Sequence, residues 1–378
     1  MTNASRRRLL GKGLLGALAA RSGLGATDLR AAPAATSVAE VRPRHLVFPR
    51  DAGAHPEFKT EWWYITGWLG QPEASHGFQI TFFRSRVDGT QGMQSRLAAR
   101  QLLFAHAAIT DVQGKRMWHD QRIARWSGET PGQNPADNAS ASVLDTGVVL
   151  HDWSLLREGS DLRARVTAED FSMDLRFGTT QAVLLQGQQG LSRKGPDTRQ
   201  SSYYYSLPQL KASGVLTLQG TPAKADTGTA WLDHEWSEEM LAGGAVGWDW
   251  MGINLFDGSA LTAFRLRDNR GNAIWDGGSF RSGVTQYTFS QGEVIFKPVR
   301  FWQSPLSQAR YPVEWVVRTP ADFYTVKAVV DNQELDSRNS TGAIYWEGLC
   351  EVWDSNNHRV GRGYLEMTGY ASALRLQG

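Results

Sequence analysis

The sequence predicts an all-β protein, and two observations lead to this prediction. The chain of 378 residues contains 15 Trp, 15 Phe and 10 Tyr, most of them in short runs where apolar and polar residues alternate. Such runs, bounded by Gly, Asp and Asn, are typical of β-strands, whereas sustained helical periodicity is nearly absent after the N-terminal segment. Many short strands at close spacing predict a sandwich or barrel rather than an α/β fold.

The predicted strands follow one another along most of the chain. We expect them at residues 61–69, 77–86, 102–110, 162–167, 173–177, 214–218, 229–236, 248–255, 260–267 and 364–370. Asp257-Gly258 joins two of them as a tight hairpin, because Asp-Gly readily adopts the positive φ that such turns require. The polar stretch at residues 127–142 is expected to be an exposed loop. A similar stretch at residues 219–228 is expected to separate two domains.

A faint internal repeat supports two copies of one unit. An acidic residue before Trp, followed by a hairpin that ends in Phe-Arg, occurs once in each half of the chain. The two copies are Glu61-Trp62 with Phe83-Arg84, and Asp249-Trp250 with Phe264-Arg265. We therefore predict two tandem barrels, the first over residues 36–220 and the second over residues 221–378.

The N-terminal segment resembles an export signal. An Arg6-Arg7 pair precedes two leucines and a short apolar run, and small residues cluster at residues 31–35. Paired arginines before leucines are typical of twin-arginine signals. Clustered small residues are typical of the zone where a signal peptide is cleaved. We expect residues 1–35 to be removed and the mature protein to be periplasmic or secreted. The alternative is a disordered basic tail.

Charge and cysteine content exclude several classes of function. The predicted export segment holds six basic residues and one acidic residue, so the formal net charge falls from +2 for the whole chain to −3 for the mature chain. No basic cluster remains, which disfavours nucleic acid as a partner. Cys350 is the only cysteine, so an intramolecular disulfide is impossible. Its alternation with Trp346 and Val352 predicts a packed apolar residue rather than a nucleophile.

Strand alternation marks three polar or aromatic residues as candidates for a site. Along residues 229–236, His234 and Trp236 project to one otherwise apolar face. Asp249 shares its own strand face with apolar residues only. A buried ionisable group either has a structural partner or a pKa shifted by desolvation. Taken singly each residue favours the structural interpretation; taken together they form a candidate site.

Other chemistries find little support. His234 lies between Asp233 and Glu235, but neighbours on a strand point to opposite faces, and no HExxH or Cys/His pairing is present. We therefore expect no metal and no cofactor. The chain has no GxSxG motif, and Ser192 lacks a nearby base in sequence. A secreted hydrolase is therefore the least favoured alternative.

Five segments carry a family resemblance: HPEFKTEWWY (residues 55–64), LSRKG (191–195), SYYYS (202–206), WLDHEWS (231–237) and GWDW (247–250). They resemble the AttH-like family, which groups with hydroxyneurosporene synthase, the carotenoid 1,2-hydratase. The resemblance runs from about residue 55 to residue 370. It implies two lipocalin-like barrels with a ligand cavity near their interface. The hydratase branch adds water across an isolated C=C bond without a cofactor.

The resemblance also assigns site residues. The His-x-Trp of the hydratase falls on His234 and Trp236, and its essential aspartate falls on Asp249. The tyrosine expected two positions before that aspartate is Gly247 here. Asp249 would be the acid, Trp236 would stabilise the cation, and His234 would be the base or orient the acid. The expected ligand-binding residues are Glu61, Trp63, Tyr204, Trp248 and Trp250.

These observations predict a periplasmic protein that binds an apolar isoprenoid or lipid-like ligand. Protonation of an unactivated alkene requires a neutral carboxylic acid, which an apolar cavity favours. Hydration of a C=C bond is therefore the expected reaction. A non-catalytic carrier, which needs only an apolar pocket with a few polar anchors, is the alternative from another class.

Overall fold

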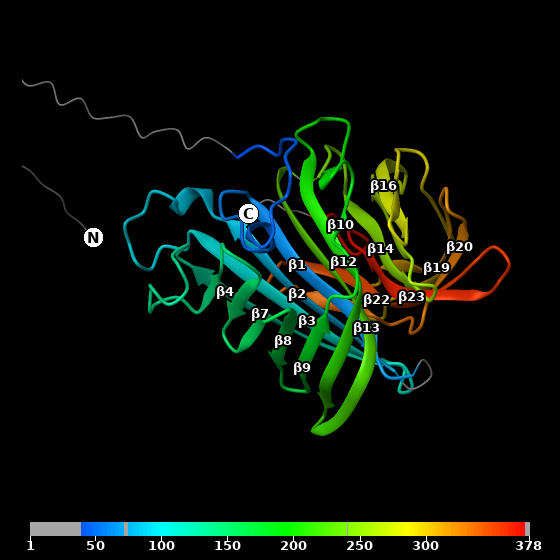
Figure 1. The fold of residues 1–378 in the computed structure, drawn as a ribbon, viewed down its shortest axis with the longest axis horizontal. Coiled ribbons are helices and arrows are strands. Elements are labelled where there is room, and N and C mark those ends of the chain that lie inside the picture. The colour runs from blue at the N-terminus through cyan, green and yellow to red at the C-terminus, as the bar shows by residue number, and fades with distance from the viewer. Residues whose placement is uncertain (1–38, 72–74, 240, 375–378) are drawn as a thin grey trace, which may run out of the picture. The chain divides into compact units, whose positions relative to one another are not determined.

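A computed structural model of the chain describes residues 39–71, 75–239 and 241–374 (Figure 1). The export signal predicted at residues 1–35 lies outside this part. The described residues form two antiparallel sheets and two short 3-10 turns, Arg50–Ala52 and Asp88–Thr90, which confirms the all-β prediction. Among them, no helix has the length and apolar character needed to cross a membrane.

The first sheet contains thirteen strands. They are β1 (Thr60–Leu69), β2 (His76–Arg86), β3 (Gln101–Asp111), β4 (Arg116–Trp126), β5 (Ala139–Ala141), β6 (Gly147–Leu150), β7 (Trp153–Glu158), β8 (Asp161–Thr167), β9 (Phe171–Gly178), β10 (Leu184–Leu185), β11 (Leu191–Arg193), β12 (Ser201–Leu218) and β13 (Thr221–Glu239). The main path runs β4-β3-β2-β1-β13-β12-β9-β8-β7-β6-β5. Its edge strands β4 and β5 contact each other, so the sheet closes almost completely into a barrel.

The second sheet contains ten strands. They are β14 (Gly247–Leu255), β15 (Ala260–Arg267), β16 (Ala273–Ser282), β17 (Thr285–Phe289), β18 (Ile295–Gln303), β19 (Arg310–Arg318), β20 (Phe323–Ala328), β21 (Glu334–Ser337), β22 (Ala343–Trp353) and β23 (Arg359–Met367). Their main order is β17-β16-β15-β14-β23-β22-β20-β19-β18. Phe289 and Phe296, from the two edge strands, pack in one core cluster. The sheet therefore wraps around its own interior.

Strand alternation builds both interiors. Along β9, Phe171, Met173, Leu175 and Phe177 are buried in the first core, while the residues between them are more exposed. Each such buried side chain contributes roughly 1.5–3 kcal/mol relative to its exposed state. The predicted Asp257-Gly258 hairpin joins β14 to β15, and Gly258 has a φ of +87°. Local pattern therefore suffices to place these strands and their inward faces.

The division between the sheets differs from the predicted domain boundary at residue 220. Strand β13 pairs along its length with β1 and β12, so it belongs to the first sheet. The polar residues at Gln219 and Gly220 have positive φ values of 46° and 78° and form the tight turn between β12 and β13. Their composition thus marks a hairpin within one barrel, and the second sheet begins at Gly247.

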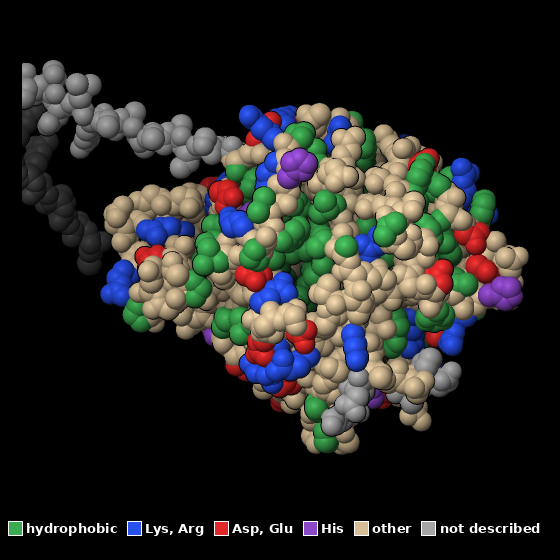
Figure 2. All heavy atoms as spheres, viewed as in Figure 1, with side chains coloured by type: hydrophobic (Ala, Val, Ile, Leu, Met, Phe, Trp, Pro, Cys, Tyr) green, Lys and Arg blue, Asp and Glu red, His purple; other side chains and the backbone are tan. Residues whose placement is uncertain are grey.

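A third apolar cluster joins the two sheets. It includes Tyr64 and Trp231 from the first sheet and Trp250 and Tyr364 from the second. Gly252 of β14 makes this approach possible, since a Cβ there would lie 2.5 Å from the Trp250 ring and 3.1 Å from the Trp231 ring. On the face shown in Figure 2, basic side chains are interspersed with acidic ones and form no continuous basic patch.

Candidate functional site

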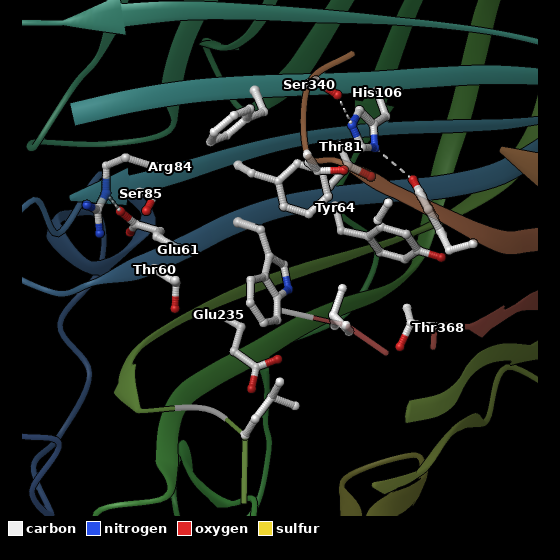
Figure 3. A pocket seen from close by; sticks show the side chains of 18 of the residues that line it. Thr60, Glu61, Tyr64, Thr81, Arg84, Ser85, His106, Glu235, Ser340 and Thr368 are labelled. Atoms are coloured by element: carbon white, nitrogen blue, oxygen red, sulfur yellow. Dashed lines mark hydrogen bonds and ion pairs between the residues drawn. The ribbon is translucent and has the colours of Figure 1, made fainter. Parts of the chain in front are cut away.

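A cavity of about 640 Å³ lies between the two sheets (Figure 3). Strands β1, β2, β3 and β13 line it from the first sheet, and β14, β15, β22 and β23 line it from the second. Its volume is within the range of small-molecule sites. Large aromatic side chains form much of its wall: Trp62, Phe83, Phe104, Trp248, Trp250 and Phe264.

Two carboxyl groups from the second sheet face this cavity. Glu347 of β22 lies directly opposite Glu366 of β23 in the strand register, and both line the cavity. Burial raises the pKa of Glu366 to about 8. Burial and then the charge of Glu366 raise the pKa of Glu347 well above its usual range. Because two facing carboxylates repel each other, the pair keeps at least one proton at neutral pH.

The charge balance of the wall supports this protonation state. Four cations line the cavity within the described part of the chain, and each already forms an ion pair with at least one acidic side chain. These pairs are Lys59–Asp88, Arg84–Glu61, Arg86–Glu238 and Lys194–Glu235. No described lining cation remains for Asp233, Glu347 or Glu366, so ionising these carboxyls would leave uncompensated buried charge.

Two polar atoms at the acid pair lack a well-formed hydrogen bond. The Glu347 Oε1 atom and the Tyr64 hydroxyl form no hydrogen bond of ordinary geometry with the described residues, but Tyr64 and Tyr345 lie near enough to Glu347 to oppose part of the rise that burial causes in its pKa. Both residues line the cavity. Buried polar groups in folded proteins are nearly always satisfied by protein or ordered water. These two atoms therefore mark a position where water or a polar ligand atom would bind.

A neutral histidine forms another part of the wall. Ser340 Oγ donates to Gln121 Oε1 at 2.6 Å and lies 2.9 Å from His106 Nε2, and the Tyr345 hydroxyl lies 2.9 Å from His106 Nδ1 (Figure 3). Burial lowers the pKa of His106 to about 3. Because the Ser340 hydroxyl donates to Gln121, its proton is not directed at His106, and the pair lacks the hydrogen bond of a Ser-His nucleophile.

Strand β13 contributes two further carboxyl groups. Asp233 accepts hydrogen bonds from the hydroxyls of Tyr204 and Ser206, at 2.7 and 2.5 Å, and from Trp231 Nε1 at 2.7 Å. Burial nevertheless raises its pKa to about 7. Glu235 forms a buried ion pair with Lys194, with Nζ and Oε1 2.8 Å apart. One carboxyl is thus held by neutral donors and the other by a cation.

The predicted catalytic residues His234 and Trp236 face the interior of the first barrel instead. His234 Nε2 lies 3.0 Å from Glu61 Oε1, and its Nδ1 lies 3.2 Å from the Tyr205 hydroxyl. Trp236 stacks on His55, with ring centroids 3.8 Å apart. Burial lowers the pKa of His234 to about 4. The alternation prediction that they share one face is correct, but neither residue lines the cavity.

Asp249, the predicted acid, lies inside the second barrel. Its Oδ2 atom is 2.7 Å from Arg265 Nε and 3.5 Å from Arg267 Nε, and its Oδ1 atom accepts from the Tyr370 hydroxyl at 2.9 Å. Asp249 is fully buried and does not line the cavity. The structure therefore brings His234 and Trp236 together, with ring centroids 4.8 Å apart, but not with Asp249.

The internal repeat has a structural meaning. Glu61 lies opposite Arg84 in the pairing of β1 with β2, and Asp249 lies opposite Arg265 in the pairing of β14 with β15. The carboxylate and guanidinium are 2.8 Å apart in the first pair and 2.7 Å apart in the second. Each barrel therefore carries the same buried acid–arginine pair across its first hairpin.

Three of the five predicted ligand-binding residues line the cavity: Glu61, Trp248 and Trp250. Trp63 instead packs inside the first barrel, with its ring 4.7 Å from that of His234. Tyr204 lies behind the wall, where its hydroxyl accepts from Trp250 Nε1 at 3.1 Å and donates to Asp233. It therefore supports lining residues without lining the cavity itself.

A histidine–carboxylate cluster in the first barrel has the composition of a metal site. One ligand atom each of His55, Glu61 and His234 lies within 4.8 Å of the others. However, His55 Nδ1 lies 2.7 Å from Glu61 and His55 Nε2 lies 3.0 Å from Asp51. Arg84 also occupies Glu61. These donors satisfy one another around a guanidinium cation, so the cluster fits a hydrogen-bonded core better than a metal centre.

Sequence reasoning missed Glu347 and Glu366. Each lies on a strand with aromatic neighbours, on the face opposite Trp346 and Met367, which pack in the second core. A carboxylate that alternates with Tyr345 or Tyr364 was the available signal. The alternation pattern does not show which strand lies alongside, so it could not reveal that Glu347 and Glu366 face each other. It is this facing of two carboxyl groups that keeps a proton on the pair at neutral pH.

Comparisons with known proteins agree with this architecture. The AttH-like family matches residues 39–370. The structure resembles an AttH protein of Nitrosomonas europaea with a TM-score of 0.79 and 43% sequence identity, over 87% of this chain and 98% of that chain. Kievitone hydratase from Nectria haematococca shares the fold with a TM-score of 0.64 and 14% identity, over 89% of this chain and 95% of that chain. No protein with a curated description matches significantly. The two sheets are tandem lipocalin-like barrels, and the chain belongs to the AttH-like family.

Proposed function

We propose that this protein binds an apolar ligand with a C=C bond between its barrels and adds water to that bond by acid catalysis. The single observation that carries the proposal is the Glu347–Glu366 pair, two facing carboxyl groups that hold a proton beside an aromatic cavity. Protonating an isolated alkene requires a neutral carboxylic acid. The proposed acid is thus Glu347 with Glu366, not Asp249, because Asp249 is held by two arginines away from the cavity.

The reaction can be written with all atoms and electrons accounted for. The carboxyl proton of Glu347 forms a C–H bond with the π electrons of the alkene, which leaves a tertiary cation and a Glu347 carboxylate. Faces of Trp248 and Trp250 stabilise the cation without capturing it. A water molecule bound at the Tyr64 hydroxyl attacks the cation and gives its proton to the Glu347–Glu366 pair. The product gains one H and one OH, and the pair recovers its starting state.

Two comparisons support the proposal. Kievitone hydratase is a hydratase by name and shares the tandem-barrel fold at 14% identity, and five segments of the sequence resemble the family that includes the carotenoid 1,2-hydratase. The fold accommodates many functions, so the acid pair remains the principal support.

The deciding experiment incubates the purified mature protein with acyclic and prenylated isoprenoids and looks by mass spectrometry for a product one water heavier. The Glu347→Gln/Glu366→Gln variant should form no product. Glu351→Gln provides a control on the same strand, because Glu351 lies outside the cavity, where its Oε1 atom pairs with Arg359 and Arg362. Saturable binding without any product would favour the non-catalytic carrier.

We also propose that the protein is exported through the twin-arginine route, on the basis of Arg6 and Arg7 and the small residues that follow. Changing both arginines to lysine should leave unprocessed precursor in the cytoplasm. Recovery of normally processed protein from the periplasm would overturn this route.

A further inference from the structure

We propose that the Lys194–Glu235 ion pair is a binding subsite for a neutral oxygen function of the substrate, a hydroxyl or a carbonyl group. This inference rests on the proposed function, because it assigns the class of molecule that enters the same cavity. The pair lines the cavity from the β11–β12 connection and from β13. It therefore provides a polar anchor on a wall whose exposed surface is mainly apolar.

The geometry of the pair leaves binding capacity on the cavity side. Lys194 is 6% exposed and Glu235 is 5% exposed. Oε1 of Glu235 is occupied by Lys194 Nζ and by the Ser202 hydroxyl. The described contacts thus use one of the three ammonium N–H groups and one of the two carboxylate oxygens. The remaining N–H groups can donate to a ligand oxygen, and Oε2 can accept from a ligand hydroxyl.

Aromatic rings fix the lysine in this position. Its Nζ atom lies 4.2 Å from the Phe264 ring centroid and 4.8 Å from the Tyr204 ring centroid. Cation–π contacts of this kind hold the ammonium group beside the two rings. Backbone pairing of Lys194 N with Gln200 O at 2.7 Å fixes the base of the side chain. The anchor is therefore preorganised before a ligand arrives.

The charges of the cavity specify a neutral ligand. The Lys194–Glu235 pair has no net charge, and three further carboxyls, Asp233, Glu347 and Glu366, face or border the same space without a described cation. A carboxylate, phosphate or diphosphate group would meet these acids with no free cation to compensate it. The charge pattern thus favours alkenyl alcohols, ketones and phenols over ionised fatty acids and prenyl diphosphates.

The test measures binding by quenching of tryptophan fluorescence, since Trp62, Trp248 and Trp250 line the cavity. The probes are geraniol and farnesol, the hydrocarbon myrcene, geranic acid at neutral pH and geranyl diphosphate. We expect the alcohols to bind at least about tenfold more tightly than myrcene and than either anion, the ratio that about 1.4 kcal/mol of a charged-group hydrogen bond provides.

The variant Lys194→Met/Glu235→Met removes both charges, because a buried ion pair can often be replaced by apolar residues without loss of folding. It should bind the alcohols no more tightly than myrcene while keeping its affinity for myrcene. The control is Lys327→Met/Glu314→Met, another Lys–Glu pair on strands β20 and β19, with Nζ and Oε1 3.6 Å apart and outside the cavity. It should keep the alcohol preference of the wild type.

The proposal is overturned if the double variant keeps the alcohol preference, if an anion binds as tightly as the alcohols, or if neither alcohol binds saturably. Binding is measured without turnover, so this result is separable from the reaction. An alcohol preference that depends on Lys194 and Glu235 supports the subsite even if no hydrated product forms. Hydration of myrcene alone, without the preference, supports the reaction and refutes the subsite.

Discussion

Two buried acids, Glu61 of β1 and Glu347 of β22, differ in the kind of partner that surrounds each carboxyl group. In the first barrel, Glu61 accepts from Arg84, from both the backbone and ring nitrogens of His55, and from His234. Between the barrels, Glu347 faces Glu366, no described lining cation pairs with it, and its polar neighbours are the neutral side chains of Tyr64 and Tyr345.

This difference distinguishes a carboxylate with a structural role from a carboxyl group that can act as an acid. Arg84 and His55 hold the pKa of Glu61 well below its usual range, against the opposing effect of burial. A carboxylate of this kind can stabilise a fold but cannot give up a proton. Burial and a like charge instead hold Glu347 in the neutral form, which suits an acid. Asp249 belongs with Glu61, since an arginine lies opposite each of them.

The largest expected effect is on turnover. Changing Glu347 to Gln keeps the shape of the side chain but removes the acidic proton, so we expect kcat to fall by about 10²- to 10⁴-fold, the usual contribution of general acid catalysis. The melting temperature should change little, because Glu347 is already uncharged in the folded protein and the amide has nearly the same shape. Steady-state kinetics and thermal melts of Glu347→Gln beside Glu351→Gln test this. Wild-type turnover in the Glu347→Gln variant would refute the assignment.

The second effect is on stability. Changing Glu61 to Gln leaves the buried Arg84 guanidinium without its counter-charge, so the free energy of unfolding should fall by about 3–5 kcal/mol. Asp174 of β9 is exposed and pairs with Arg163 of β8. Asp174→Asn should lower the free energy of unfolding by less than about 1 kcal/mol. Urea unfolding curves measure both. A loss at Glu61 no larger than that at Asp174 would contradict a structural role for the network.

Asp249→Asn should have a smaller effect, a loss of about 1–3 kcal/mol. The arginines left behind retain other contacts, because Arg267 lies 3.7 Å from the Tyr370 ring centroid and Arg265 lies 5.2 Å from that of Trp315. Turnover per folded molecule should be unchanged. The measurement pairs the melting temperature with kcat, and a stable, ligand-binding but inactive variant would restore Asp249 as the acid.

A further expected effect is on the pH dependence of stability. The unfolded chain releases the Glu366 proton near the ordinary value of 4.5, whereas the folded protein keeps it to about pH 8. Stability should therefore fall as pH rises from about 4.5 to 8, by at most about 1.4 kcal/mol per pH unit from this group. His234, with its pKa lowered to about 4, acts oppositely: stability falls as pH drops below 6.5.

Chemical denaturation across this pH range provides the measurement. Glu366→Gln should flatten the decline above pH 4.5 and leave the acid limb unchanged. An unaltered upper limb would mean that Glu366 is ionised in the folded protein at neutral pH, which would remove the basis for the proposed acid pair.

Alternation and turn chemistry were enough to predict the all-β fold class and the strands they marked, because both act over a few neighbouring residues. They placed the β14–β15 hairpin at Asp257-Gly258 and set His234 and Trp236 on one face of β13. They did not show which face of β13 meets the cavity, since both faces are buried. One packs inside the first barrel, and the other carries Asp233 and Glu235 toward the second sheet.

The proposed acid pair was harder to predict for a similar reason. Glu347 and Glu366 are ordinary polar positions in alternating strands, and only the register of β22 with β23 sets them opposite each other. The absence of a cation for them depends on contacts from four different segments of the chain. Local periodicity does not show which charged side chains pair with one another in the folded protein.

A cavity walled by both sheets has a thermodynamic consequence. A ligand that binds only when both walls are in place stabilises the two barrels together, by an amount that grows with ligand concentration above its Kd. Saturating ligand should therefore merge any separate unfolding steps of the barrels into one transition. Barrels prepared as separate polypeptides should not bind the ligand until they are mixed. Ligand binding could then be used to measure the association of the two barrels as well as the affinity for the ligand.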